Sequence, residues 1–354
     1  PSQSGPPYAP TTASLGGFPT VHLDDPICAV LLALYVAAAA THMTIFQINR
    51  RRDHKFVFSG MLFGFCMARI TTLTLRIVWA SYPHDVNIAI AASIFVQAGV
   101  LLLFIVNLIF AQRIVRSYHP KFGWSRGLGW VFKFLYFCVL AMLIMVITAV
   151  VDTFFTLNVS TRMKDRDITL FAGTFLALLA FLPIPIALLS MLIPRSHRPE
   201  KFGQGRYRTK LSLLLFTSFI LSVGACFRLA VNYTTPRPIT DPAWYHSKAC
   251  FYCFNFAIEL VVVYLYAISR FDRRFHVPNG SSAPGHYSGS KVGKDGRRAS
   301  TGARSAAGGP SLEVNRESDV FGDDEEPALQ DRRQVEWEAS ALAELNKSAV
   351  IEEA

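Results

Sequence analysis

The chain has 354 residues, of which 51% are hydrophobic and only 17% are charged, whereas about 25% of the residues in an ordinary soluble domain are charged. The formal net charge is +10, and the basic residues stand beside long apolar blocks, which is the pattern of charges that flank membrane spans. This distribution disfavours a partnership with nucleic acid and a pair of soluble domains. It predicts an integral membrane protein.

The chain divides into an apolar middle and two polar tails. Residues 1–25 contain several Pro and no Lys or Arg, and they predict a short disordered tail. A bilayer core about 30 Å thick requires roughly 20 helical residues, since each residue adds about 1.5 Å. Seven blocks within residues 26–270 meet this requirement and predict an all-α bundle of seven transmembrane helices. Residues 271–354, rich in Gly, Ser, Arg and Glu, predict a second disordered tail.

In chain order, the expected helices span residues 26–48, 56–81, 88–112, 131–157, 168–193, 211–233 and 247–269. Pro183 and Pro185 fall inside the fifth block. Because proline removes a backbone hydrogen bond and clashes with the preceding turn, these two residues predict a kink there.

The Lys and Arg residues beside these blocks are distributed unequally between the two sides of the membrane. Most of them directly follow the first, third, fifth and seventh blocks. Because cytoplasmic loops carry the excess of Lys and Arg, the N-terminus is expected outside and the C-terminus in the cytoplasm. The plasma membrane is the expected location, with an endomembrane as the alternative. On this orientation the sequons at Asn158 and Asn232 are the candidates for glycosylation, and those at Asn279 and Asn346 are not.

The second block contains an unusual row of polar residues. Arg69, Thr72 and Arg76 lie on one helix face, because residues three and four apart are neighbours on a helix. Each arginine costs about 2.5 to 3.5 kcal/mol near the bilayer centre on insertion scales, so this helix needs partners for both. Glu259 of the seventh block has roughly the depth of Arg69. The matching depths predict an ion pair between Arg69 and Glu259.

A second group of charges is expected nearer the outer surface. Asp152 of the fourth block has a depth close to those of Arg76 and Arg228, which predicts a cluster of these three residues. Three arginines against two acids leave one positive charge, and a buried uncompensated charge is costly. An anionic ligand, a lipid phosphate or water is expected to compensate this positive charge. The candidates for a ligand site or charge network are Arg69, Thr72, Arg76, Asp152, Arg228 and Glu259.

The alternative is that these charges only lock the bundle together, with Arg76 and Arg228 reaching to the outer headgroups. The other polar chemistry is sparse. Cys28, Cys250 and Cys253 lie near outer helix ends, so a disulfide between Cys28 and either of the others is open.

Several chemistries find no support in the sequence. Only His42 lies inside a block, which disfavours an intramembrane zinc hydrolase, and the seventh block has no central Lys for a Schiff base with retinal. No glycine-rich nucleotide loop occurs. The sequence predicts no enzyme, no metal and no cofactor. In the C-terminal tail, Ser300 follows Arg297-Arg298-Ala299 and is a candidate for phosphorylation by a basophilic kinase.

Four stretches carry a resemblance to a known family. They are Met67-Ala-Arg-Ile-Thr-Thr-Leu-Thr-Leu-Arg-Ile-Val-Trp-Ala80 and residues 97–113, 166–170 and 181–185. Together they resemble a fungal family of seven-helix membrane proteins of unknown function, some of which are labelled receptor-like. More loosely, the layout is similar to that of the fungal lipid-translocating exporter-like proteins. The resemblance covers roughly residues 20–275 and implies a fold and a membrane, but no reaction.

Three functions remain open on the sequence alone. The first is a receptor-like protein or sensor with a polar pocket in the outer half of the bundle, which would signal to a cytoplasmic partner. The second is a transporter or translocator of a lipid or small anion, in which the same arginines hold an anionic headgroup. The third is a membrane scaffold without catalysis. Membrane lipids are expected partners in all three.

Overall fold

The computed structural model describes residues 5–52, 54–194 and 199–288. The expected phosphorylation site at Ser300 and the sequon at Asn346 lie outside these residues. Within them the fold is helical, and the only strand-like pairing is a single bridge between Thr12 and Pro238. Seven helical spans are long and apolar enough to cross a membrane, as expected.

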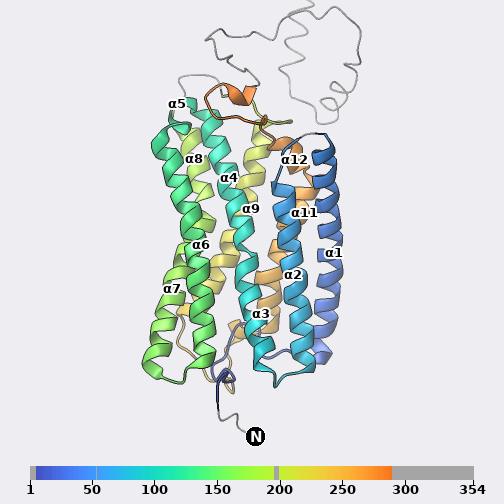
Figure 1. Ribbon diagram of the computed structural model, residues 1–354, viewed down its shortest axis with the longest axis vertical. Coiled ribbons are helices and arrows are strands. Elements are labelled where there is room, and N and C mark those ends of the chain that lie inside the picture. The colour runs from blue at the N-terminus through green and yellow to red at the C-terminus, as the bar shows by residue number, and fades with distance from the viewer. Residues whose placement is uncertain (1–4, 53, 195–198, 289–354) are drawn as a thin grey trace, which may run out of the picture.

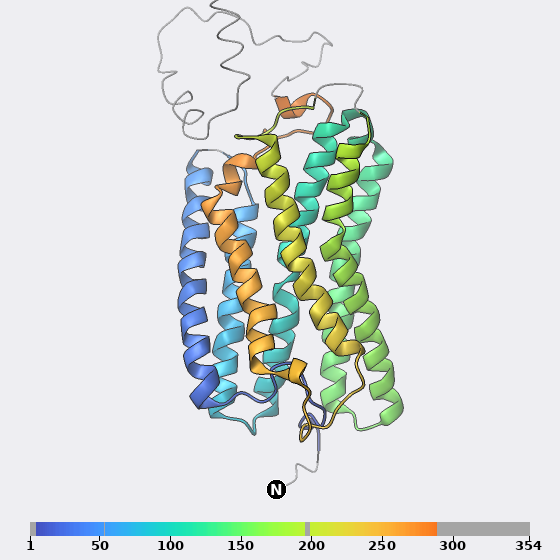
Figure 2. The same cartoon turned by 180° about the vertical axis from the view of Figure 1, so that it is seen from behind.

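The long helices run side by side along the length of the molecule (Figures 1 and 2). Three of the seven spans are built from two or three consecutive helical elements: α3 with α4, α7 with α8, and α10 with η2 and α11. The elements are α1 (Val21–Arg51), α2 (Phe58–Ser81), α3 (Val86–Gly99), α4 (Leu101–Tyr118), α5 (Pro120–Gly123), α6 (Arg126–Phe155), α7 (Val159–Phe181), α8 (Pro183–Leu192), α9 (Tyr207–Tyr233), η1 (Trp244–His246), α10 (Lys248–Tyr252), η2 (Cys253–Ala257), α11 (Ile258–Ile268), α12 (Phe271–Arg274) and η3 (His286–Ser288).

The two ends of this bundle are named here by the chain termini that lie nearest to them. The N-terminal end carries residues 5–20 and the turns at 82–85 and 156–158, and the C-terminal end carries residues 119–125 and 269–288 (Figure 1).

Local chemistry explains where several helices begin. Asp85 accepts a hydrogen bond from the backbone N–H of Asn87 at 2.9 Å and so caps α3. Asn158 caps α7 in the same way through Ser160, also at 2.9 Å. Because the first N–H groups of a helix have no partner within it, a short polar side chain at this position stabilises the start of the helix.

Two spans are interrupted near their middle. The fifth span breaks at Leu182, between α7 and α8, directly before Pro183. This is where the sequence predicted a kink, and the cause is the missing N–H of proline. The third span breaks at Val100, between α3 and α4, where no proline occurs. The side chain that contacts this break is described below.

The N-terminal segment, residues 5–20, is folded against the bundle rather than disordered. The N–H groups of Tyr8 and Ala13 donate to the carbonyl oxygens of Phe154 and Arg237, at 2.7 and 2.8 Å. At Gly16, φ is +82° and a Cβ atom would overlap the ring of Phe251, so only glycine fits. The expectation of a disordered tail over residues 1–25 therefore does not hold for residues 5–25.

The first part of the expected C-terminal tail is also folded. Phe275 stacks on Phe110 with ring centroids 4.1 Å apart, and Phe271 and Phe275 are fully buried. Tyr287 packs against Trp124 and Phe202. These aromatic anchors hold residues 271–288 across the C-terminal end, because burying each ring removes a large apolar area from water.

The outer faces of the helices are strongly apolar. On α6 a row of large side chains is more than half exposed: Trp130, Phe134, Phe137, Leu140 and Ile144. A soluble protein rarely exposes a continuous apolar strip of this length. Lipid is the solvent that such a surface fits.

Candidate functional site

Arg69 of α2 and Glu259 of α11 form a two-pronged ion pair in the interior of the bundle. Nε of Arg69 donates to one carboxylate oxygen at 2.6 Å and Nη2 donates to the other at 2.7 Å. Both side chains are at most 1% exposed. The structure thus brings together the two residues whose depths matched in the sequence. A bidentate arginine–carboxylate pair combines strong hydrogen bonds with a fixed geometry.

The third nitrogen of Arg69 explains the break in the third span. Nη1 donates to the carbonyl oxygen of Val96 at 3.0 Å, in the last turn of α3. This approach is close, since a Cβ atom at Gly99 would lie 3.0 Å from Cζ of Arg69. A side chain that inserts into the ladder of backbone hydrogen bonds is a known cause of helix interruption. The helix is interrupted at Val100.

Arg228 of α9 approaches Glu259 from the other side. Its Nη1 lies 3.8 Å from Oε1 of that carboxylate and donates to the carbonyl oxygen of Phe254 at 3.1 Å. Phe254 belongs to η2, a π-helical segment in which the regular pattern of backbone hydrogen bonds is shifted. Gly224 permits this contact, because a Cβ atom there would lie 3.1 Å from the Phe254 oxygen. Sequence patterns gave no sign of the π-helical segment.

Arg76 holds the N-terminal segment on the bundle. Its Nη2 donates to the carbonyl oxygen of Gly16 at 2.6 Å and to Asp24 at 3.1 Å, and its Nη1 donates to Gly17 at 3.2 Å. The guanidinium also lies over the ring of Phe251, 4.4 Å from its centroid. Arg76 therefore finds its hydrogen-bond acceptors and its counter-charge within the protein.

Asp24 is the acid that sequence reasoning missed. It is fully buried near the start of α1 and also accepts hydrogen bonds from Lys248 and from the hydroxyl of Tyr252, the latter at 2.6 Å. Its place before the apolar block of the first helix gives no sequence signal that the side chain is buried. Cys28, one turn further on, lies 3.2 Å from the Tyr252 hydroxyl and is unpaired, so the disulfide considered above does not form.

The expected cluster of Arg76, Arg228 and Asp152 is wrong. Asp152 of α6 lies instead beside Asp165 of α7. Depth in a helix fixes the height of a side chain in the membrane but not the direction in which it points. Arg76 finds its acid on α1, and Arg228 shares Glu259 with Arg69.

Arg76 and Arg228 nevertheless line one cavity, together with Thr72. It has a volume of about 180 Å³ and lies near the N-terminal end of the bundle, where the N-terminal segment forms part of its wall. No Asp or Glu is among the side chains that line it. These are Ser14, Leu15, Thr72, Arg76, Trp79, Ala92, Ser93, Val96, Gln97, Arg228, Val231, Asn232, Phe251 and Asn255.

A smaller hollow of about 40 Å³ adjoins this cavity and shares Gln97, Arg228 and Asn232 with it. Asn232, one of the two candidate glycosylation sites, therefore belongs to the cavity wall. Asn158, the other, caps α7 at the N-terminal end.

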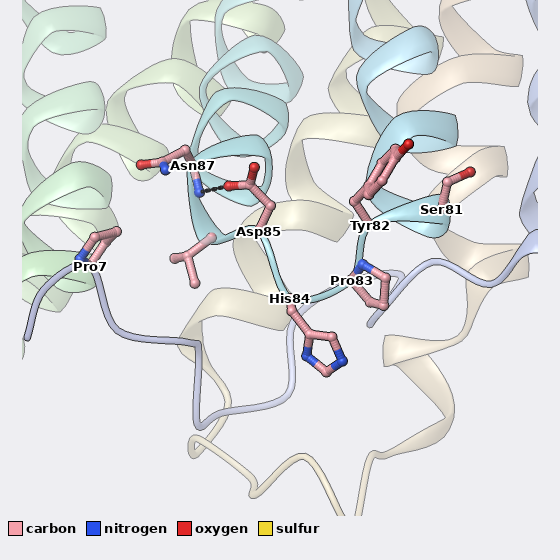
Figure 3. A pocket seen from close by; sticks show the side chains of 8 residues that line it. Pro7, Ser81, Tyr82, Pro83, His84, Asp85 and Asn87 are labelled. Carbon is pink, nitrogen blue, oxygen red and sulfur yellow. Dashed lines mark hydrogen bonds between the residues drawn. The ribbon is translucent and has the colours of Figure 1, made fainter. Parts of the chain in front are cut away.

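A second, more open pocket lies at the turn between α2 and α3 (Figure 3). It has a volume of about 460 Å³ and is bounded by Pro7 and by residues 81–87. Figure 3 shows Asp85 turned toward the start of its own helix and His84 pointing away from it. Because its one acidic side chain already caps α3, this pocket offers little for a specific ligand. The cavity lined by Arg76 and Arg228, the cationic cavity, is the stronger candidate.

The seven apolar spans and the buried charges define this chain as a multi-pass membrane protein. Residues 201–276 match the model of a family described as a protein of unknown function, DUF3112. No curated protein and no solved structure matches the chain significantly. The matched stretch contains Arg228, the π-helical segment η2 and Glu259, but the family description brings no activity with it.

Proposed function

We propose that this protein is a receptor-like membrane sensor that binds a small anionic ligand in the cationic cavity. The excess of Lys and Arg beside the C-terminal end supports a cytoplasmic position for that end, so the cavity opens toward the outside of the cell. The receptor-like label in the fungal seven-helix family that the sequence resembles supports the same role. The plasma membrane is the proposed location, and no catalytic activity is assigned.

The observation that carries this proposal is the charge left over around the cavity. Arg69 and Arg228 share the single carboxylate of Glu259, so one positive charge remains without a buried counter-charge. Such a charge is costly in a medium of low dielectric constant. Since no acidic side chain lines the cavity, an anion that enters it restores neutrality and binds for that reason.

Packing below the cavity favours a sensor over a transporter. Beyond the Arg69–Glu259 pair, Asn107 lies in a buried hydrogen-bonded group with Thr217, Ser218 and Tyr266. The stacked rings of Phe110 and Phe275 follow toward the C-terminal end. A transported anion would have to displace all these layers, because interiors are close-packed.

A signal, by contrast, needs only a mechanical connection through the layers. α11 carries both Glu259 and Tyr266 and ends beside α12 at the C-terminal end. An anion that draws Arg228 away from Glu259 and from the Phe254 carbonyl therefore acts directly on this helix. The proposed readout is a change at the C-terminal end that a cytoplasmic partner recognises.

Transport of a lipid or small anion is the second candidate function. It is favoured by the interrupted helices at Val100 and Leu182, since broken helices near the bilayer centre are a feature of many transporters. A purely structural scaffold would not require a cavity that carries a net charge.

Proteoliposomes separate the two candidates. The purified full chain would be tested for movement of labelled phospholipid between leaflets and for efflux of trapped chloride, phosphate and acetate, beside Arg228→Gln and Glu259→Gln variants. The sensor predicts no movement above that in protein-free liposomes. Movement of phospholipid or anion that is present in the wild type and lost in both variants would overturn the sensor proposal and favour the transporter.

Hydrogen exchange supplies the positive arm of the test. The chain in lipid nanodiscs would be measured with and without a mixture of chloride, phosphate and short carboxylates. The sensor predicts altered exchange in residues 258–276, in the wild type and in Arg237→Gln, whose exposed arginine lies outside the cavity. No change there, or a change that persists in Arg228→Gln, contradicts the proposal.

A further inference from the structure

Arg228 leaves one edge of its guanidinium without a protein partner. All its hydrogen bonds to described residues come from Nη1, which donates to the Phe254 carbonyl and, at 3.4 Å, to Oδ1 of Asn255. Among these residues none accepts from Nε or Nη2. The side chain is 16% exposed, and the spaces that it lines are the cavity and the adjoining hollow. A ligand can reach the free N–H groups only from these spaces.

The free edge has the shape of a carboxylate site. The N–H bonds at Nε and at Nη2 are parallel, so they match the two oxygens of a planar carboxylate. The molecule already contains this arrangement, since Arg69 binds Glu259 and Arg270 binds Asp272 through the same two nitrogens. Lysine could not provide it, because an ammonium group is a point charge without a planar fork.

The charge of the site selects a single negative charge. Arg76 is in direct contact with Asp24, and Lys248, which is also paired with Asp24, is 21% exposed and reaches solvent. The unmatched charge next to the cavity is therefore that of Arg228. A dianion such as a phosphate monoester would leave one negative charge buried without a partner, which is again costly.

Size and wall chemistry define the rest of the ligand. A volume of about 180 Å³ is smaller than the pockets of about 300 Å³ or more that hold drug-sized ligands. The walls contain the apolar side chains Trp79, Phe251, Leu15 and Val231, beside polar ones such as Gln97 and Asn255. The apolar side chains among them fit a ligand with a compact apolar part. A diacyl lipid is too large to be enclosed.

We infer that the ligand is a small monocarboxylate with a compact apolar or aromatic body. Its carboxylate is held by Nε and Nη2 of Arg228, and its body lies against Trp79 and Phe251. This inference rests on the proposed function, because it names the class of ligand for the same cavity.

Calorimetry on the full chain in lipid nanodiscs tests the inference, with benzoate as the probe. Benzamide is its neutral isostere, benzylammonium carries the opposite charge, and inorganic phosphate is the polyanionic alternative. Benzoate is expected to bind, and benzamide at least about tenfold more weakly, since a charged hydrogen-bonded pair is worth at least that factor. Benzylammonium is expected not to bind.

Four variants locate the probe. Arg228→Gln and Arg228→Lys should each weaken benzoate at least about tenfold, the second because it keeps the charge and loses the fork. Val231→Phe should block binding by filling the cavity without a change of charge. Arg237→Gln, which removes an exposed arginine at the same end of the bundle, should bind benzoate like the wild type.

The outcomes distinguish this inference from the proposed function. Equal binding of benzoate and benzamide, or full binding to Arg228→Lys, overturns the carboxylate site. Phosphate binding that depends on Arg228, with no benzoate binding, also overturns the carboxylate class but leaves an anion sensor in place. Uptake of labelled benzoate into proteoliposomes, with the expected variant pattern, supports the carboxylate class and removes the sensor.

Discussion

The two ends of the bundle are built in different ways. At the N-terminal end, the space between helices contains charges and a cavity, and Arg69, Arg76 and Arg228 share the acids Asp24 and Glu259. At the C-terminal end, stacked aromatic rings fill the same space, and the buried Lys210 and Asp272 are enclosed with them.

This difference separates two ways of holding helices together in a membrane. Between apolar helices in lipid, close packing holds the contact, and the Phe110–Phe275 stack is an example. A buried ion pair fixes position and direction instead, but it stabilises little beyond its own desolvation cost. The end with the cavity has room for an added anion, whereas the interior of the aromatic end is filled by its own side chains.

The largest test of this comparison removes the acid at the centre of the charged end. Glu259→Leu leaves Arg69 buried without a counter-charge and should lower the free energy of unfolding by about 3 to 5 kcal/mol. Reversible unfolding in mixed micelles would measure the loss. The double variant Arg69→Met with Glu259→Leu should recover part of it, because the charge of Arg69 is gone and only that of Arg228 is left unmatched, as in the wild type. If the double variant is less stable than Glu259→Leu alone, the pair contributes through packing rather than charge.

The sequence was sufficient to predict the elements that this test addresses. Length and apolarity identified seven spans, and equal depth identified Arg69 and Glu259 as partners. Both predictions rest on position along a helix, which a sequence gives directly. The kink before Pro183 belongs to the same class, since its cause is local.

The features that the sequence did not predict depend on contacts between distant segments. Asp24 is a partner of Arg76 because α1 begins at Val21 and packs beside α2, and the N-terminal segment then contacts the same arginine through Gly16. Asp152 points toward α7 because of the rotation of α6 about its own axis, which hydrophobic periodicity fixes poorly in a helix that is apolar on all sides. The π-helical segment η2 arises where α9 and the seventh span pack closely at Gly224, and no local pattern announces it.

A smaller effect is expected from the closure of the C-terminal end. At Gly203, φ is +58° and a Cβ atom would overlap the carbonyl group of Arg274, so Gly203→Ala should cost about 1 to 3 kcal/mol. Gly127→Ala is the matched control, because a Cβ atom there meets nothing within 4 Å. Thermal unfolding in nanodiscs would compare the two. Equal unfolding temperatures of the two variants would contradict the comparison, because the C-terminal end would then tolerate a strained backbone and would not be tightly packed.

The smallest expected effect concerns pH, and a histidine with a lowered pKa lies at each end. At the C-terminal end His276 lies beside His54, with ring centroids 4.7 Å apart. Burial, followed by the nearby His54 and Arg113, lowers the pKa of His276 to about 4, and Asp272 opposes this only in part. At the N-terminal end, burial and then Arg237 lower the pKa of His246.

Between about pH 6.5, the usual pKa of histidine, and pH 4, the unfolded chain binds a proton at residue 276 that the folded chain does not bind. Stability at the C-terminal end should therefore fall as the pH drops through this window, and it should be fully present above it. Hydrogen exchange of residues 271–276, corrected for the chemical effect of pH, would report the loss between pH 7 and pH 5. His276→Asn should remove most of this acid response, whereas His84→Asn, at an exposed turn of the other end, should leave it unchanged. An acid response that survives in His276→Asn would contradict the assignment to His276.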